Sequence, residues 1–174
     1  MPARGPLAFD PIAEARRHWE DHGWQEAAPG MAMVTSIMRV QQVLIGHVDR
    51  ALRPFGLTFA RYEVLMLLLF SRQGSLPLGK VGARLQVHPA SVTNVVDRLE
   101  ADGLVRRVPH PSDGRATLAE ITAAGRDLAD RATDALNGAV FEPVALTRGQ
   151  LDDLVELLRR LRVAEGDFDP SGAG

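Results

Sequence analysis

The chain has 174 residues, of which 45% are apolar and 24% charged, a composition typical of a globular domain rather than of a disordered chain. Its formal net charge is −2, so overall charge does not indicate a nucleic-acid partner. There is no cysteine, which excludes disulfides, thiolate metal sites and thiol-based redox sensors. The longest apolar run, residues 64–70, is too short to cross a bilayer, and the N-terminus lacks a signal-peptide core, so we expect a cytoplasmic protein with no membrane partner.

Spacing of apolar residues and capping signals predict helices through the first third of the chain. Residues 1–30 are expected to form an N-terminal extension with one short helix over 11–25. Ala28-Pro29-Gly30 is predicted to end the helical structure of this extension. A long helix follows within residues 31–57 and is the candidate dimerisation helix. Thr58 is a good N-cap for the next helix, which is expected to reach about residue 72.

The middle of the chain, residues 58–121, has the element order of a winged helix-turn-helix. After a loop over 71–77, a short helix (78–85), a tight connection (86–88) and a second helix (89–101) are predicted. Gly103 ends that helix, and two β-branched runs follow, separated by turn-forming residues, which predicts a β-hairpin. We therefore expect a DNA-binding domain of this class.

The C-terminal third is predicted to contain two dimerisation helices within residues 122–165. Thr122 caps the first, and Thr147 with Gln150 forms a capping box for the second. The last helix carries leucines that alternate spacings of three and four, the seam of a two-heptad coiled coil: Leu151, Leu154, Leu158 and Leu161. Residues 166–174 are rich in Gly, Asp, Pro and Ser and are predicted to be disordered.

The predicted second helix of the helix-turn-helix has two different faces. One face is apolar and suits an inner, buried position: Val92, Val95, Val96 and Leu99. The remaining face carries small or hydrogen-bonding groups, as a major-groove surface requires: Ala90, Ser91, Thr93, Asn94, Asp97 and Arg98. From residue 79 to 115 there are six basic and four acidic residues, so this region is modestly basic within a nearly neutral chain.

The chain resembles the MarR family (multiple antibiotic resistance regulators) over about residues 31–161. The resemblance rests on four segments in a fixed order: Pro54-Phe-Gly-Leu-Thr-Phe-Ala-Arg-Tyr-Glu-Val-Leu, Ser91-Val-Thr-Asn-Val-Val-Asp-Arg-Leu-Glu-Ala-Asp-Gly-Leu-Val, Pro111-Ser-Asp-Gly-Arg and Ile121-Thr-Ala-Ala-Gly-Arg. It implies a mainly α (α+β) fold, a winged helix-turn-helix with long N- and C-terminal dimerisation helices. It also implies a homodimer that binds a palindromic operator in double-stranded DNA and is released by a small-molecule effector, with a repressor as the expected role.

The resemblance also implies which side chains contact DNA. Asn94 suits the adenine edge and Arg98 a phosphate, and strand alternation turns only one of Arg106 and Arg107 outward. At the tip of the wing, an Arg enters the minor groove and an Asp two residues earlier orients it. The expected DNA-binding residues are Ser91, Thr93, Asn94, Arg98, Arg106, Asp113 and Arg115.

The expected effector is an anionic aromatic molecule, for which Arg or His would supply the counter-charge. Candidate effector-binding residues are Trp19, His47, Arg50, Tyr62 and Glu63. The alternative for each is a structural polar residue satisfied within the fold. His18 and His22 have metal-ligand spacing, but two ligands without a third do not make a site, so no metal and no cofactor are predicted.

Two other functions compete with a ligand-responsive DNA-binding regulator. A winged helix used only for protein contacts would not need basic residues on one side of the domain. A small helical hydrolase would need catalytic motifs, and the sequence has neither a Gly-rich phosphate loop nor His-Glu-x-x-His. We therefore expect a regulator rather than an enzyme, with the effector, the operator and the regulated genes left open.

Overall fold

The computed structural model describes residues 5, 7–85, 89–112 and 116–172. The chain divides into two compact units, residues 1–140 and 141–174, which are described separately below.

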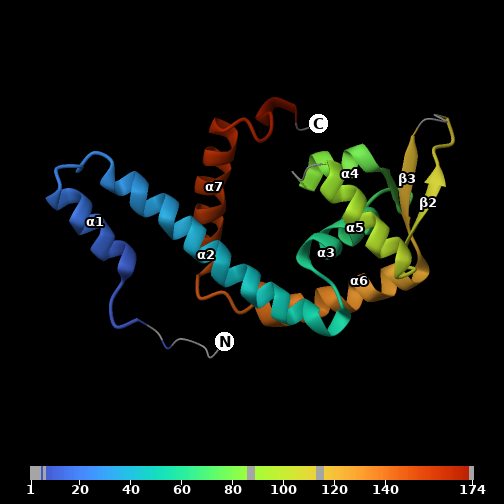
Figure 1. Cartoon of the computed structure of the whole chain (residues 1–174), viewed down its shortest axis with the longest axis horizontal. Coiled ribbons are helices and arrows are strands. Elements are labelled where there is room, and N and C mark those ends of the chain that lie inside the picture. The colour runs from blue at the N-terminus through green and yellow to red at the C-terminus, as the bar shows by residue number, and fades with distance from the viewer. Residues whose placement is uncertain (1–4, 6, 86–88, 113–115, 173–174) are drawn as a thin grey trace. The chain divides into compact units, whose positions relative to one another are not determined.

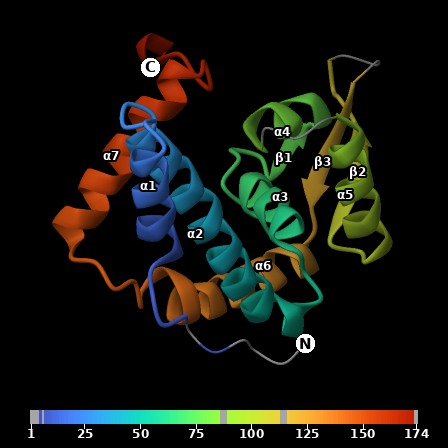
Figure 2. The same ribbon diagram turned by 60° about the vertical axis from the view of Figure 1, so that its left-hand side comes forward.

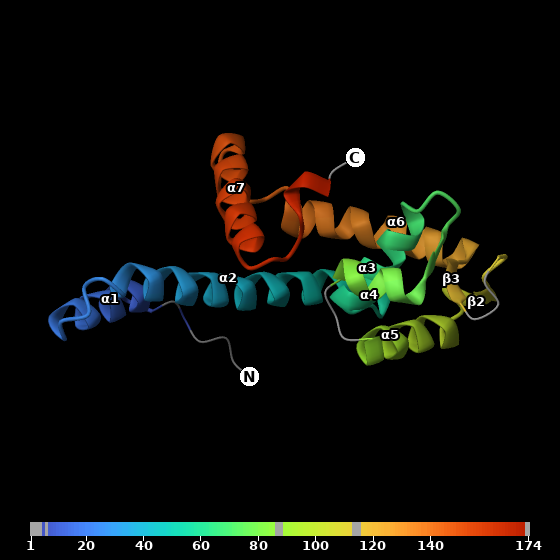
Figure 3. The same ribbon diagram turned by 90° about the horizontal axis from the view of Figure 1, so that it is seen from above.

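The first unit begins with two helices that pack against each other, α1 (Pro11–Asp21) and α2 (Ala28–Leu52) (Figure 3). Asp10 caps α1 by accepting a hydrogen bond from the Ile12 N–H at 2.9 Å. The predicted break over residues 28–30 is wrong, because α2 already begins at Ala28. Pro29 stands in its first turn, where a backbone N–H has no partner within the helix and its loss carries no penalty.

The winged lobe follows α2 and a short 3₁₀ turn, η1 (Arg53–Phe55), and its elements gather at one end of α2 (Figure 1). The lobe contains α3 (Phe59–Leu69), β1 (Ser75–Pro77), α4 (Leu78–Leu85), α5 (Pro89–Ala101), β2 (Val105–Pro109), β3 (Thr117–Ile121) and α6 (Ala123–Leu136). Thr58 caps α3 as predicted, and Gly103, with φ +71°, follows the end of α5. The mainly helical winged helix-turn-helix fold is thus confirmed.

The three strands form one antiparallel sheet in the order β1-β3-β2. The predicted hairpin is present, with Val105 opposite Ile121 and Arg106 opposite Glu120. The expectation of a plain loop over 71–77 is wrong, because residues 75–77 pair with β3 as β1. A three-residue strand that ends in Pro carries no alternation to detect, and its partner lies more than 40 residues away in the sequence.

One hydrophobic core holds the lobe together and joins it to α2. Its fully buried members include Leu52 from α2, Leu65 and Leu68 from α3, Leu99 from α5 and Leu136 from α6. Helix α6 lies against α2 and α3 (Figure 2) and continues into a π-helical turn, η2 (Asn137–Phe141). The boundary between the units therefore falls after α6, inside the segment predicted to hold both C-terminal dimerisation helices.

The second unit is built around α7 (Arg148–Ala164), which begins with the predicted Thr147–Gln150 capping box. No residue of α7 is buried, and its apolar side chains stay largely open: Leu154 is 45% exposed and Leu161 40%. The segment expected to be disordered contains a 3₁₀ turn, η3 (Pro170–Gly172). Asp167 of the same segment forms an ion pair with Arg162 of α7. Among the described residues, no helix is both long and apolar enough to cross a membrane.

Candidate nucleic-acid interface

Helix α5 presents a polar face to solvent and an apolar face to the lobe. Ser91, Thr93, Asn94 and Arg98 are exposed. On the predicted inner face, Val92, Val96 and Leu99 are buried, and Val95 is half-buried against the core. Both faces lie where the sequence placed them. The exposed groups can donate and accept hydrogen bonds, the chemistry that reading of base edges requires.

Two of the candidate DNA-binding residues on this face contact each other. The Nε of Arg98 donates a hydrogen bond to Oδ1 of Asn94, one turn earlier, at 3.1 Å. Arg98 directly follows Asp97, an acid with which it could pair. In the structure Asp97 pairs elsewhere, so Arg98 stays on the outer face beside Asn94.

The acidic residues of α5 and its C-terminal end are held by arginines from other elements. Arg107 on β2 pairs with Asp97 at 2.5 Å and also with Glu100, while Arg61 on α3 pairs with Asp102 at 3.1 Å. Without these ion pairs, the carboxylates would repel the phosphate backbone of DNA, because like charges that lie close together repel each other. Because Arg107 neutralises Asp97 and Glu100, the net charge of the outer face of α5 is the positive charge of Arg98.

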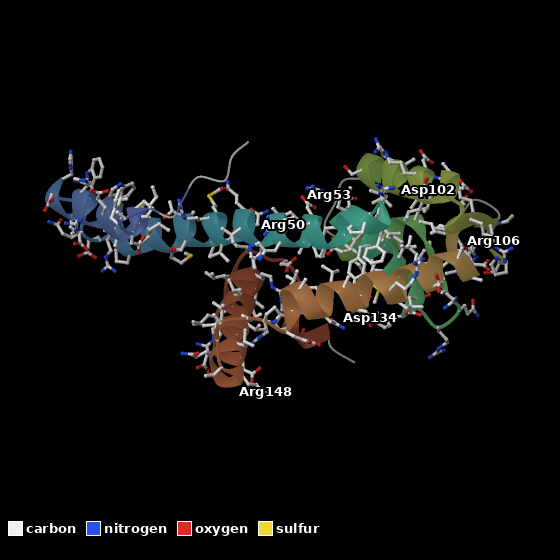
Figure 4. All side chains as sticks on the ribbon, turned by 90° about the horizontal axis from the view of Figure 1, so that it is seen from below. Arg50, Arg53, Asp102, Arg106, Asp134 and Arg148 are labelled. Carbon is white, nitrogen blue, oxygen red and sulfur yellow. The ribbon has the colours of Figure 1, made fainter. Side chains whose placement is uncertain are left out.

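The two neighbouring arginines of β2 have different surroundings. The side chain of Arg106, labelled in Figure 4, is 64% exposed. It pairs with Glu120, its cross-strand partner, at 2.6 Å. The side chain of Arg107 is only 26% exposed and faces α5. The prediction that alternation turns only one of them outward is confirmed, and Arg106 is that residue. Asp113 and Arg115, the expected wing-tip pair, lie outside the described residues.

The five candidate effector-binding residues lie on three helices of the first unit. Trp19 is on α1, in edge-to-face contact with Trp24 at 5.2 Å between ring centroids. His47 and Arg50 are exposed on α2, and Figure 4 shows Arg50 on this helix. Tyr62 on α3 is buried, and its hydroxyl lies 3.0 Å from that of Thr133 on α6.

Glu63, also on α3, is half-buried, and this burial raises the pKa of its carboxyl above the usual value. Among the described residues, no group of three or more His, Asp or Glu side chains is placed to hold a metal ion.

The sequence did not identify Arg61 and Arg107 as ion-pair partners of the acidic residues of α5 and its C-terminal end. Both belong to segments that carry the family resemblance or adjoin them, but their partners are 41 residues away for Arg61 and 7 and 10 residues away for Arg107. Only the packed fold brings these charges together.

Comparison with known proteins identifies the family. A family model described as the MarR family matches residues 57–117. The crystal structure of Sco5413, a MarR family transcriptional regulator from Streptomyces coelicolor, is 52% identical, with a TM-score of 0.74, and the match covers 81% of this chain and 98% of that one. The chain belongs to the MarR family. As a member of this family it is a DNA-binding transcriptional regulator and not an enzyme.

Two further relatives are informative. Sco3205, another MarR family regulator from Streptomyces coelicolor, was solved in complex with DNA; it is 30% identical, with a TM-score of 0.68, and the match covers 82% of this chain and 89% of that one. The transcriptional repressor Rv2887 from Mycobacterium tuberculosis is 33% identical over 126 residues, which cover 72% of this chain and 89% of that protein.

Proposed function

We propose that this MarR family member is a homodimeric repressor that binds a palindromic operator through α5 and the β2–β3 hairpin, and that a small ligand releases it. The observation that carries the DNA-binding part is the outer face of α5. Its exposed side chains are polar or cationic at Ser91, Thr93, Asn94 and Arg98, while the neighbouring acids Asp97 and Glu100 are paired with Arg107.

The proposed contacts follow from the chemistry of each group. Asn94 offers an amide to base edges in the major groove, Arg98 and Arg106 offer guanidinium groups to phosphates, and Ser91 and Thr93 offer hydroxyls. For Arg106, DNA phosphate would compete with the exposed ion pair to Glu120, which is worth little in water. Asp113 and Arg115 complete the proposal at the wing tip, from the sequence alone.

The dimer is supported by apolar surface that the single chain leaves open on α2 and α7. Along α2, eight large apolar side chains are at least 38% exposed: Met33, Val34, Ile37, Met38, Val40, Val43, Leu44 and Ile45. At 100° per residue, Ile37 and Leu44 share one side of the helix, while Met38 and Ile45 share another side about 100° away. A helix that is apolar over so much of its circumference is normally surrounded by protein.

A homodimer would present two copies of α5 related by a two-fold axis, which matches a palindrome with half-sites about one helical turn apart. Repression is the role of the repressor Rv2887 among the relatives, and we propose it here on that likeness. Release by an anionic aromatic ligand, with His47 and Arg50 as counter-charges, remains a proposal from the family resemblance. A panel of metabolites tested by thermal shift would find it, since a ligand bound only to the folded protein raises its Tm.

The test of DNA binding is selection from a library of random-sequence duplexes with the wild-type protein. A regulator of this kind should enrich a palindrome and protect it in a footprint, with affinity that falls steeply as salt rises. Enrichment of no sequence, together with no detectable binding to duplex DNA even at low salt, would contradict the proposal and favour a winged helix that contacts only proteins.

A further inference from the structure

We propose that Arg107 is a positioning residue for DNA binding, which ties the β2–β3 hairpin to α5 so that both elements meet the DNA as one rigid unit. This inference rests on the proposed function of α5 and the hairpin. Arg107 itself is not expected to touch DNA, because its side chain faces α5 and is only 26% exposed.

Arg107 is linked to α5 at three points. Its backbone N–H donates to Oε1 of Glu100 at 3.0 Å, its guanidinium pairs with the other carboxylate oxygen of Glu100, and a second guanidinium nitrogen pairs with Oδ1 of Asp97 at 2.5 Å. Asp97 and Glu100 are one turn apart on the same helix. A planar guanidinium bound at two acids fixes orientation as well as distance, so one strand residue sets the angle of the helix against the hairpin.

The link also controls charge beside the face that we propose reads DNA. Asp97 comes three residues after Asn94 and directly before Arg98, and its side chain is 57% exposed. Without Arg107, this carboxylate would stand unpaired next to phosphates bound by Arg98. Loss of Arg107 should therefore loosen the hairpin and add repulsion toward DNA, two effects with separate signatures.

The first experiment compares wild type and Arg107→Met on the duplex that wild type enriches from the random library. We expect about a 10-fold loss of affinity, with hydroxyl-radical protection lost where the hairpin contacts the duplex and retained where α5 does. The salt slope should fall along with hairpin protection, because the phosphate contacts of the hairpin, that of Arg106 included, are lost as a group. Arg106→Met, one residue earlier, should instead lower the salt slope by about 1 and leave hairpin protection in place.

The second experiment tests the pair directly. Asp97→Asn combined with Arg107→Met should bind more tightly than Arg107→Met alone, since the unpaired carboxylate is gone. Asp102→Asn is the matched control: it makes the same change just beyond the end of the same helix, but Asp102 pairs with Arg61 of α3. Its footprint should remain that of wild type.

Three results would overturn the inference. A fall in the salt slope for Arg107→Met with hairpin protection retained, as expected for Arg106→Met, would make Arg107 a direct phosphate contact. Strictly additive effects of Asp97→Asn and Arg107→Met, or uniform weakening of the whole footprint, would reduce the link to general stability. If Arg107→Met does not fold, Asp97→Asn and Glu100→Gln break the same links with Arg107 in place, and retained hairpin protection in both would refute the proposal.

Failure of the proposed function would be distinct from all of these results, because wild type itself would then enrich no duplex.

Discussion

A methyl group at Gly125 would collide with the backbone of the lobe. A Cβ built there would lie 2.2 Å from the Leu104 carbonyl oxygen and 2.9 Å from Cγ1 of Ile121. Gly125 is buried in the first turn of α6, and its N–H donates to the Thr122 hydroxyl at 3.0 Å. Helix α6 can approach the end of the hairpin this closely only without a side chain at this position.

We therefore expect Gly125→Ala to lower the free energy of unfolding by about 1–3 kcal/mol, because neither α6 nor the Leu104 carbonyl can move without disturbing the core. Urea denaturation would measure the change. Gly79→Ala is the control: Gly79 is exposed in α4 with nothing within 4 Å of the added Cβ, so this variant should be neutral or slightly stabilising. Equal losses at both positions would show that the close approach is not what matters.

The hydrogen bond between Arg98 and Asn94 couples the two side chains that we propose contact DNA from the outer face of α5. Asn94→Ala should relax sequence preference by about 1–3 kcal/mol at one base pair. Arg98→Ala should weaken binding to all sequences and lower the salt slope by about 1. Because the two side chains touch, the double variant should lose less than the sum of the single losses, which a double-mutant cycle on the enriched duplex would measure.

Among the elements, the start of α6 is joined to the connection between α5 and β2 through one hydroxyl. The Thr122 Oγ1 caps α6 and also lies 2.9 Å from the Gly103 carbonyl oxygen and 3.1 Å from that of Leu104. We expect Thr122→Ala to reduce stability by about 1–2 kcal/mol and Thr122→Ser to keep most of it, since Ser preserves the hydroxyl. Thermal or urea unfolding of the two variants would separate the hydroxyl from the methyl group.

The elements were predictable from the sequence where local signals decide them. Thr58, Thr122 and Thr147 each cap a helix as expected, because capping depends on residues two or three positions away. The start of α2 was misplaced because Pro29 is a breaker inside a helix but acceptable in its first turn. Strand β1 was missed because only its pairing with β3 makes it a strand.

The candidate DNA-binding face of α5 was also predictable from a local signal, whereas the arginine that pairs with the acids of α5 was not. The 3.6-residue period places Thr93, Asn94 and Arg98 opposite the buried Val92 and Val96. The same period says nothing of Arg107, which reaches α5 only because the hairpin folds back against that helix. Alternation along β2 predicts that one arginine turns inward, but the acids that it meets are fixed by tertiary packing.

For the whole molecule, the open apolar surface of α2 and α7 carries the expectation of a constitutive homodimer. Ile37→Glu and Leu154→Glu should each shift the protein toward monomer in light scattering. Burial of one such side chain is worth roughly 1.5–3 kcal/mol, and a symmetric dimer loses two, so the dimer Kd should rise by about 10²–10⁴-fold. Phe70→Glu is the control, because Phe70 is 79% exposed at the end of α3, outside both helices; a monomer from this variant, or a wild-type monomer, would contradict the expected interface.

Helix α2 is one uninterrupted helix, so a movement at one of its ends is transmitted to the other. Its 25 residues form a rod about 37 Å long, open and apolar along its middle and locked by Val48 and Leu52 into the core of the winged lobe. Such a rod works as a lever: a tilt of about 5° at one end displaces the other by about 3 Å, close to the rise of one base-pair step. If the winged lobe binds DNA as we propose, a change in how the far end of α2 is held would therefore shift the lobe by about one base-pair step.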